Sequence, residues 1–256
     1  MKLHYKELGQ DGKPSIVILH GVFGSSDNWL SVGKVLSMHY KVYLLDARNH
    51  GASPHSNEFN YLVMAGDVAE FIEDKQITKP VLIGHSMGGK TVMKFNEHYP
   101  HVALKNVIVD ISPRYYPPHH QKILQGLNAI PLDTLLDRRQ ADDILKNYEP
   151  SESVRQFLLK NLVRTENGFV WRINLKVISE KINNVGEANI PSKRIDTRTL
   201  FIKGALSDYI TENDETMIKN IFSNCEIVTI ADAGHWIHAE KPQDFLNVVR
   251  KFLNEF

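Results

Sequence analysis

Residues 80–90 have the sequence Pro80-Val81-Leu82-Ile83-Gly84-His85-Ser86-Met87-Gly88-Gly89-Lys90. The apolar run up to Gly84 predicts a short buried strand, and the residues after Ser86 predict a helix. The turn between them has the form Gly-x-Ser-x-Gly, which in this setting is typical of a nucleophile elbow that raises the serine hydroxyl above a sheet. The glycines at positions 84 and 88 are explained if the backbones of the strand and the helix pass too closely to leave room for a Cβ atom. Since this pattern also arises by chance, the prediction depends on partner residues elsewhere in the chain.

Strand-like and helix-like segments alternate on both sides of this turn. Continuous apolar runs predict strands covered on both faces, and amphipathic spacing predicts the helices between them. The predicted strands cover residues 2–8, 15–20, 41–46, 80–85, 104–110, 198–204 and 226–230, and the predicted helices cover 27–38, 61–75, 87–99, 213 onward and 242 to the end. This alternation indicates βαβ units, and therefore an α/β fold with a mostly parallel central sheet and helices on both faces.

The alternation stops at residue 112 and resumes at residue 197. Between them we find helical patterns and no convincing buried strand, at residues 119–129, 132–147, 151–163 and 174–187. Residues 168–173 fit an extended piece. We therefore expect a core formed by residues 1–111 and 197–256. Residues 112–196 are expected to form a helical cap, or lid, over the carboxyl edge of the sheet.

Composition excludes several classes of protein. The 256 residues contain 30 Lys and Arg and 30 Asp and Glu, so nothing indicates a nucleic-acid binder or a membrane-surface protein. The single cysteine, Cys225, excludes an internal disulfide and a cysteine metal cluster, and fits a reducing compartment. No apolar window is long enough to span a membrane, and the first residues lack the apolar region of a signal peptide. We expect a cytoplasmic protein, although removal of a leader would leave the same sequence.

The polar residues of greatest chemical interest each follow a predicted strand. They are His20, Asp46, Ser86, Asp110, Ser207, Asp208 and His235. In open parallel sheets, ligands bind at the carboxyl ends of the strands. The sequence therefore predicts a single site at this edge of the sheet.

A serine nucleophile needs a histidine base held by a carboxylate. Among twelve histidines we select His235, because it follows the last strand and precedes a helix. Five others lie in polar or loop segments and are expected at the surface, namely His55, His98, His101, His119 and His120. His119 and His120 are among them, and they lack the further ligands of a metal site. The acid is either Asp110 or Asp208, since both give the chain order Ser, Asp, His.

Attack on a carbonyl creates an oxyanion, which needs two N–H donors. The Met87 N–H is one, because it follows the nucleophile in the elbow. The glycine-rich loop at residues 20–24 is placed to supply the other. Val22 is our first choice there and Phe23 the second.

These motifs together resemble the α/β-hydrolase superfamily, over essentially the whole chain. The narrower match is to the YbfF-type small bacterial esterases and their mitochondrial relatives. The matching segments are His20-Gly21-x-x-Gly24 and residues 46–51, 84–90, 109–113, 171–174 and 234–242.

The resemblance implies a carboxylesterase or thioesterase that acts on short- to medium-chain acyl groups without a metal or cofactor, with acyl-CoA as a plausible class. It also bears on the acid. Most α/β-hydrolases carry the acid where this chain has Ser207, whereas the YbfF-like branch uses the aspartate that Asp110 matches. Asp110 is therefore favoured, with Asp208 as the alternative and Ser207 as an accessory residue that hydrogen-bonds His235 or Asp110.

The resemblance also marks Trp171, Arg172 and Asn174, in the cap, as typical of the branch. An aromatic ring, a cation and an amide there would suit a pocket for an anionic acyl donor. Alternatively, Trp171 anchors the cap to the core. Two other functions remain open: a non-hydrolytic enzyme such as a lyase resembling those of the menaquinone pathway, and a non-catalytic binding protein. The partner in each enzymatic case is a small molecule, and the oligomeric state is not predicted.

Overall fold

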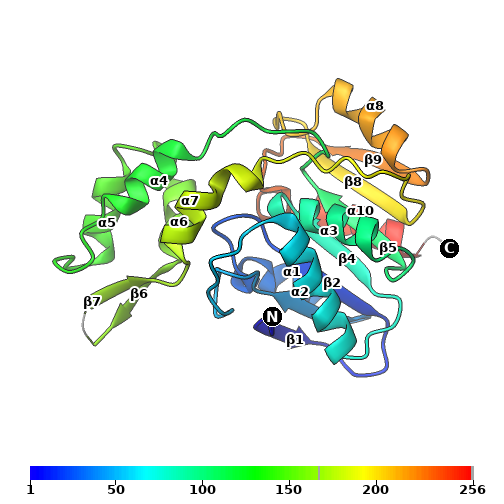
Figure 1. The fold of residues 1–256 in the computed structure, drawn as a ribbon, viewed down its shortest axis with the longest axis horizontal. Helices are drawn as coiled ribbons and strands as arrows, with labels where there is room; N and C mark the ends of the chain where they lie inside the picture. Colours follow the sequence, from blue (N-terminus) through cyan, green and yellow to red (C-terminus); the bar gives the residue numbers. More distant parts are fainter. Residues whose placement is uncertain (167, 255–256) are drawn as a thin grey trace.

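The computed structural model describes residues 1–166 and 168–254. Its main sheet has the strand order β1-β3-β2-β4-β5-β8-β9 (Figure 1). The strands are β1 (Tyr5–Leu8), β2 (Ser15–Leu19), β3 (Lys41–Leu45), β4 (Val81–His85), β5 (Lys105–Val109), β8 (Arg198–Gly204) and β9 (Cys225–Ile230). Neighbouring strands pair in parallel, except that β1 runs antiparallel to β3. The predicted α/β fold with a mostly parallel sheet is therefore confirmed.

Helices cover both faces of this sheet. One face packs against the 3₁₀ helix η1 (Ser26–Trp29), α1 (Leu30–Leu36) and α10 (Pro242–Asn254), and the other against α2 (Tyr61–Asp74), α3 (Met87–His98) and α8 (Glu212–Ile221). In β2, Ile16 and Ile18 belong to the first apolar layer, whereas Val17 and Leu19 belong to the second. Burial of each such side chain contributes about 1.5–3 kcal/mol, which explains the continuous apolar runs of these strands.

Element ends differ from the prediction in a few places. The first strand begins at Tyr5 rather than residue 2, because the His4 N–H donates to the Ser53 Oγ at 2.8 Å instead of to β3. The helix α9 (Ile237–Glu240) was not predicted, since a single turn shows no periodicity. The last helix was predicted to reach residue 256, and its final two residues lie outside the described part of the chain.

In the sequence, the predicted cap follows β5 and precedes β8. In space, it extends to one side of the sheet (Figure 1). It contains α4 (Gln121–Asn128), α5 (Arg138–Leu145), α6 (Glu152–Leu159), α7 (Leu175–Val185) and the hairpin of β6 (Leu162–Thr165) and β7 (Gly168–Trp171). The four predicted helices are present but shorter. The third ends at Leu159 rather than residue 163, because Leu162 pairs with Trp171 in the hairpin.

The two linkers of the cap run side by side. The Tyr116 N–H donates to the Gly186 carbonyl at 2.8 Å, and the Asn189 N–H donates to the Pro113 carbonyl at 2.7 Å. The chain therefore leaves the core and returns to it at almost the same place.

Lys90, on α3, holds both linkers. Its buried ammonium donates to the backbone carbonyl of Arg114 at 2.7 Å and also to that of Glu187. Burial lowers the pKa of Lys90 to about 7. These two carbonyls, one on the outgoing and one on the returning linker, provide acceptors for an amine that would otherwise be costly to bury.

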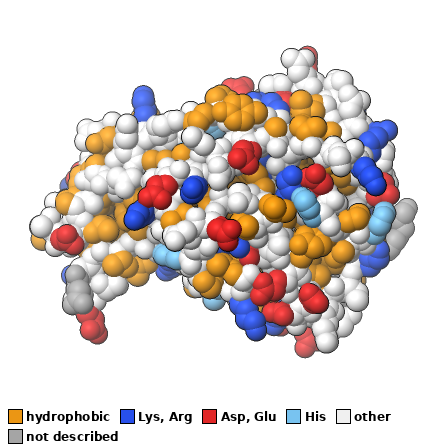
Figure 2. All heavy atoms as spheres, viewed as in Figure 1, with side chains coloured by type: hydrophobic (Ala, Val, Ile, Leu, Met, Phe, Trp, Pro, Cys, Tyr) orange, Lys and Arg blue, Asp and Glu red, His pale blue; other side chains and the backbone are white. Residues whose placement is uncertain are grey.

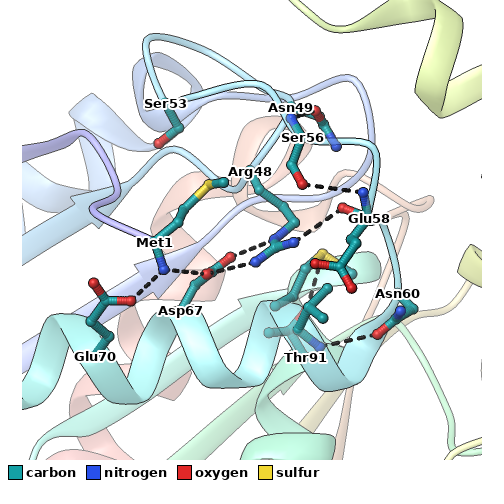
Figure 3. A network of polar contacts seen from close by, with 12 residues as sticks. Met1, Arg48, Asn49, Ser53, Ser56, Glu58, Asn60, Asp67, Glu70 and Thr91 are labelled. Carbon is teal, nitrogen blue, oxygen red and sulfur yellow. Dashed lines mark hydrogen bonds and ion pairs between the residues drawn. The ribbon is translucent and has the colours of Figure 1, made fainter.

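A buried ion pair fixes the turn after β3 to α2 (Figure 3). The Arg48 guanidinium donates to both carboxylate oxygens of Asp67, at 2.6 and 2.8 Å, and to the Glu58 carbonyl at 3.1 Å. Asp67 also accepts from the Met1 amino group at 2.8 Å. Two parallel N–H···O bonds fix both position and orientation, so this turn presents His50 to the site in a defined way.

Charged side chains of both signs are interspersed over the face drawn in Figure 2, in line with the formal net charge of zero. Among the helices described here, none is both long enough and apolar enough to span a bilayer.

Candidate active site

Ser86 lies between β4 and α3 with the strained backbone that the elbow predicts. Its φ of 51° and ψ of −116° fall in a region that L-residues rarely occupy. The two glycines have the predicted role. A Cβ on Gly84 would lie 2.3 Å from the Gly88 carbonyl oxygen, and one on Gly88 would lie 2.4 Å from the Leu19 carbonyl oxygen. A larger residue at position 84 would separate β4 from α3, and one at position 88 would separate α3 from the end of β2; either would move Ser86.

Asp110 and His235 meet at the carboxyl ends of their strands. The Nδ1 of His235 lies 2.8 Å from the Oδ2 of Asp110. Asp110 has no exposed surface, and it also accepts from the Gly204 N–H at 3.1 Å and from the Ser207 hydroxyl. Asp208, the alternative acid, is exposed, and its backbone carbonyl accepts from Arg114. The structure therefore places the Asp110 carboxylate beside His235, and the Ser207 hydroxyl donates a hydrogen bond to the same carboxylate.

Burial sets the protonation of this pair. Burial raises the pKa of Asp110 to about 6, and the hydrogen bonds from Ser207 and Gly204 oppose part of that rise. Burial lowers the pKa of His235, with a smaller contribution from the nearby His119. Near pH 7, the imidazole is thus neutral and the carboxylate ionised. Nδ1–H donates to Asp110, and the lone pair is on Nε2, as a base acting on Ser86 requires.

The backbone around Phe23 distinguishes the two candidate oxyanion donors. The loop is closed by a bond from the Gly24 N–H to the Gly21 carbonyl at 3.0 Å, and Phe23 has a φ of 62°. The Phe23 N–H donates to the Nε2 of His50 at 3.2 Å, while the Nδ1 of His50 donates to the Arg48 carbonyl. The Phe23 N–H is therefore already engaged by an acceptor, which favours Val22 as the donor.

Ser86 and His235 line one cavity of about 280 Å³ between core and cap. Most of its wall is apolar. The core contributes Val22, Phe23, Trp29 and Trp236, and the cap contributes Ile123, Val154, Phe157 and Leu158. A second cavity of about 20 Å³ also reaches Ser86, on the side of Met87 and Tyr209. Such a concave, mostly apolar space with a few polar groups is typical of a small-molecule site.

Several residues of the site were missed or misplaced by the sequence analysis. Tyr209 stacks on the His235 ring, with ring centres 3.8 Å apart. His119 is exposed, as expected, and it also lines the cavity, with its Nε2 2.7 Å from the Tyr209 hydroxyl. His120 was expected at the surface, but it is half-buried in the cavity wall. His85 donates from Nε2 to the His235 carbonyl at 2.9 Å. These contacts join distant segments, so no local pattern could reveal them.

Trp171, Arg172 and Asn174 do not line the cavity, and their predicted role as a substrate pocket is therefore corrected. The Trp171 side chain packs in the apolar cluster that cap and core share. Arg172 lies 3.5 Å from Asp27, and Asn174 donates from Nδ2 to the Oδ1 of Asn49 at 3.0 Å. All three lie where the cap meets the core, which agrees with the alternative reading of Trp171 as an anchor.

Within residues 1–166 and 168–254, no group of three or more His, Cys, Asp or Glu side chains is arranged to hold a metal ion. The cavity instead presents the Ser86 hydroxyl and the His235 imidazole, and the buried Asp110 carboxylate lies behind that imidazole. This set suits acid–base and nucleophilic chemistry.

Relatives of known sequence extend over nearly the whole chain. The chain is 37% identical to the esterase YbfF of Escherichia coli (strain K12) over 248 residues, which cover 96% of this chain and 95% of that protein. It is 39% identical to the sn-1-specific diacylglycerol lipase ABHD11 of Xenopus tropicalis over 250 residues, which cover 94% of this chain and 78% of that protein. The predicted resemblance to YbfF-type esterases is thus confirmed.

The fold has equally similar solved relatives. A marine microorganism esterase superimposes with a TM-score of 0.94 at 38% identity, over 98% of this chain and 99% of that one. A family model described as the alpha/beta hydrolase fold matches residues 14–242. The chain belongs to the α/β-hydrolase family.

Proposed function

We propose that the protein is a serine hydrolase that cleaves carboxylic esters through an acyl-enzyme on Ser86. The observation that carries this proposal is the buried Asp110 carboxylate 2.8 Å from Nδ1 of His235, with His235 and Ser86 on the same cavity. The relatives support the reaction class, since the two named above are an esterase and a diacylglycerol lipase.

The mechanism follows from the positions of these groups. The Ser86 Oγ attacks the ester carbonyl carbon as its proton passes to Nε2 of His235, and Asp110 stabilises the imidazolium that forms. The N–H groups of Met87 and Val22 stabilise the oxyanion. Collapse of this intermediate breaks the ester C–O bond, and the leaving alcohol takes the proton from His235. Water then attacks the acyl-enzyme by the same route and releases the acid and free Ser86.

The cavity favours substrates with a short to medium apolar chain. Its volume of about 280 Å³ is at the lower end of small-molecule sites, and side chains of the cap form much of its wall. The same attack would cleave an acyl thioester, including an acyl-CoA, because the reacting group is again an acyl carbonyl. The partner is then a small acyl ester or thioester.

A substrate panel tests this proposal. The purified protein is assayed with p-nitrophenyl esters and acyl thioesters of graded chain length, and it is labelled with a fluorophosphonate probe. We expect hydrolysis that is best for short to medium chains, and probe attachment at Ser86. Absence of both turnover and labelling would contradict a serine hydrolase and favour a binding protein, while labelling without hydrolysis would favour a non-hydrolytic enzyme.

The pH dependence of kcat/KM tests the state of the base. Because burial lowers the pKa of His235 from its usual 6.5, the base stays neutral near pH 7 and becomes protonated only below pH 6.5. Asp110 and His235 share a hydrogen bond, so the pair takes up its first proton with one apparent pKa. We expect kcat/KM for a neutral ester to be constant above about pH 7 and to fall as the pH drops below 6.5. If kcat/KM falls to half of its maximum already above pH 7 while fluorescence shows an intact fold, the expected pH dependence is contradicted.

A further inference from the structure

Asn161 joins the cap to the loop that carries the candidate oxyanion donor. It lies after α6 and before β6, and only 4% of its surface is exposed. Its Nδ2 donates to the Phe23 carbonyl at 2.7 Å and to the Leu158 carbonyl at 3.2 Å. Its own carbonyl accepts from the Arg172 N–H at 2.8 Å, which anchors the residue in the hairpin.

Phe23 is thereby held from both sides. The core holds its N–H through His50 at 3.2 Å, and the cap holds its carbonyl through Asn161. This double hold is needed because Phe23 has a φ of 62°, a conformation that costs about 1–3 kcal/mol, and because glycines stand at positions 21 and 24. Without it, the loop would have low-cost alternatives.

The orientation of this loop matters for the reaction. An oxyanion donor acts by being aimed before charge develops, so a small rotation of the Val22 peptide weakens transition-state stabilisation while affecting substrate binding much less. We infer that Asn161 is a positioning residue, through which the cap fixes the oxyanion loop for catalysis. This inference rests on the proposed hydrolase function.

The same residue links the loop to the wall of the cavity. Val154, Phe157 and Leu158, which line the cavity, belong to α6, and Asn161 bonds the Leu158 carbonyl beyond the end of that helix. A chain seated against α6 therefore contacts the element that supports the Phe23 carbonyl. The cap thus takes part in the chemical step as well as in enclosing the substrate.

The variant Asn161→Asp tests this role. Aspartate has the same shape, but it presents an oxygen to the Phe23 carbonyl, so the hydrogen bond is lost and replaced by repulsion. We expect kcat on a short p-nitrophenyl ester to fall by about tenfold or more, with KM changed less than twofold; loss of a whole oxyanion donor costs about 10²–10³. Affinity for phenylboronic acid, which forms a tetrahedral adduct with a serine nucleophile, should fall in parallel with kcat. Asn161→Gln, which keeps the amide, should recover part of the loss.

Asn184 offers a matched control. It lies on α7 of the cap, and its Nδ2 donates to the Phe59 carbonyl of the core at 2.9 Å rather than to a residue of the oxyanion loop. We expect Asn184→Asp to keep kcat and boronate affinity near the wild-type values. If both variants lose kcat equally, the effect comes from cap docking in general and the inference is wrong. If Asn161→Asp does not fold, Asn161→Ala is put to the same test.

The two proposals fail in different ways. A wild-type protein that neither hydrolyses esters nor reacts with the fluorophosphonate probe contradicts the proposed function. An active wild-type protein whose folded Asn161→Asp variant keeps kcat within twofold contradicts only the role of Asn161.

Discussion

Ser86→Ala is expected to lose essentially all ester hydrolysis while retaining the fold. Alanine tolerates the backbone at φ 51° no worse than serine does, and Gly84 and Gly88 keep the close approach of α3 to β4 and to β2. The variant lacks the hydroxyl that forms the acyl-enzyme, so the two-step route is closed. Removal of a serine nucleophile costs on the order of 10⁴–10⁶ in kcat in enzymes of this mechanism.

The measurement is kcat on a short p-nitrophenyl ester, together with thermal melting and fluorophosphonate labelling. Ser179→Ala serves as the control, because Ser179 lies on α7 and bonds Asn128, on another cap helix. We expect this control to retain activity and labelling. Substantial turnover by folded Ser86→Ala would exclude the acyl-enzyme mechanism.

Asp110→Asn is expected to reduce kcat by at least about 10²-fold, approaching the ~10⁴ seen when a triad aspartate becomes its amide. The amide cannot offset the charge of the imidazolium, and its NH₂ group would oppose Nδ1–H and favour the wrong tautomer of His235. The substitution also disturbs the hydrogen bonds from Ser207 and from the Gly204 N–H.

Asp208→Asn provides the comparison within the same turn. Asp208 is exposed, and its contact to Arg114 uses the backbone carbonyl, which the substitution leaves intact. We expect a loss below about tenfold, or about 1.4 kcal/mol. Both variants are assayed on one ester at one pH after thermal melting has verified the fold. If Asp208→Asn proves the more damaging, Asp208 is the acid.

The parts of the site that depend on local sequence were predictable. The elbow is specified by five adjacent residues, so its backbone follows from the sequence around Ser86. His235 and Asp110 were found because each follows a strand, and parallel strands bring their carboxyl ends to one edge. Spacing alone could not choose between Asp110 and Asp208, since both follow neighbouring strands. The family resemblance favoured Asp110, and only the three-dimensional structure shows which carboxylate lies beside His235.

The remaining features depend on contacts between distant segments. Asn161 and Phe23 are separated by 138 positions, and nothing near either residue indicates the other. The first two residues of β6, Leu162 and Val163, were predicted as helix, because the apolar spacing of residues 151–163 fits a helix until the pairing with β7 is known. Tyr209 stands two residues from Ser207, yet its stacking on His235 depends on how β8 and β9 end.

The two linkers of the cap are held together largely through main-chain groups, and this has a consequence for evolution and engineering. Lys90 binds the linkers through two main-chain carbonyls. The linker segments at residues 113–116 and 186–189 form main-chain hydrogen bonds with each other. Every residue type offers these carbonyls, so at the linkers a different cap could be spliced in by recombination with few demands on side chains beyond the glycine at position 186, where a Cβ would lie 2.1 Å from the Tyr116 carbonyl oxygen. Selection could then exchange the whole substrate-facing segment among relatives while the chemistry of the sheet edge is inherited unchanged.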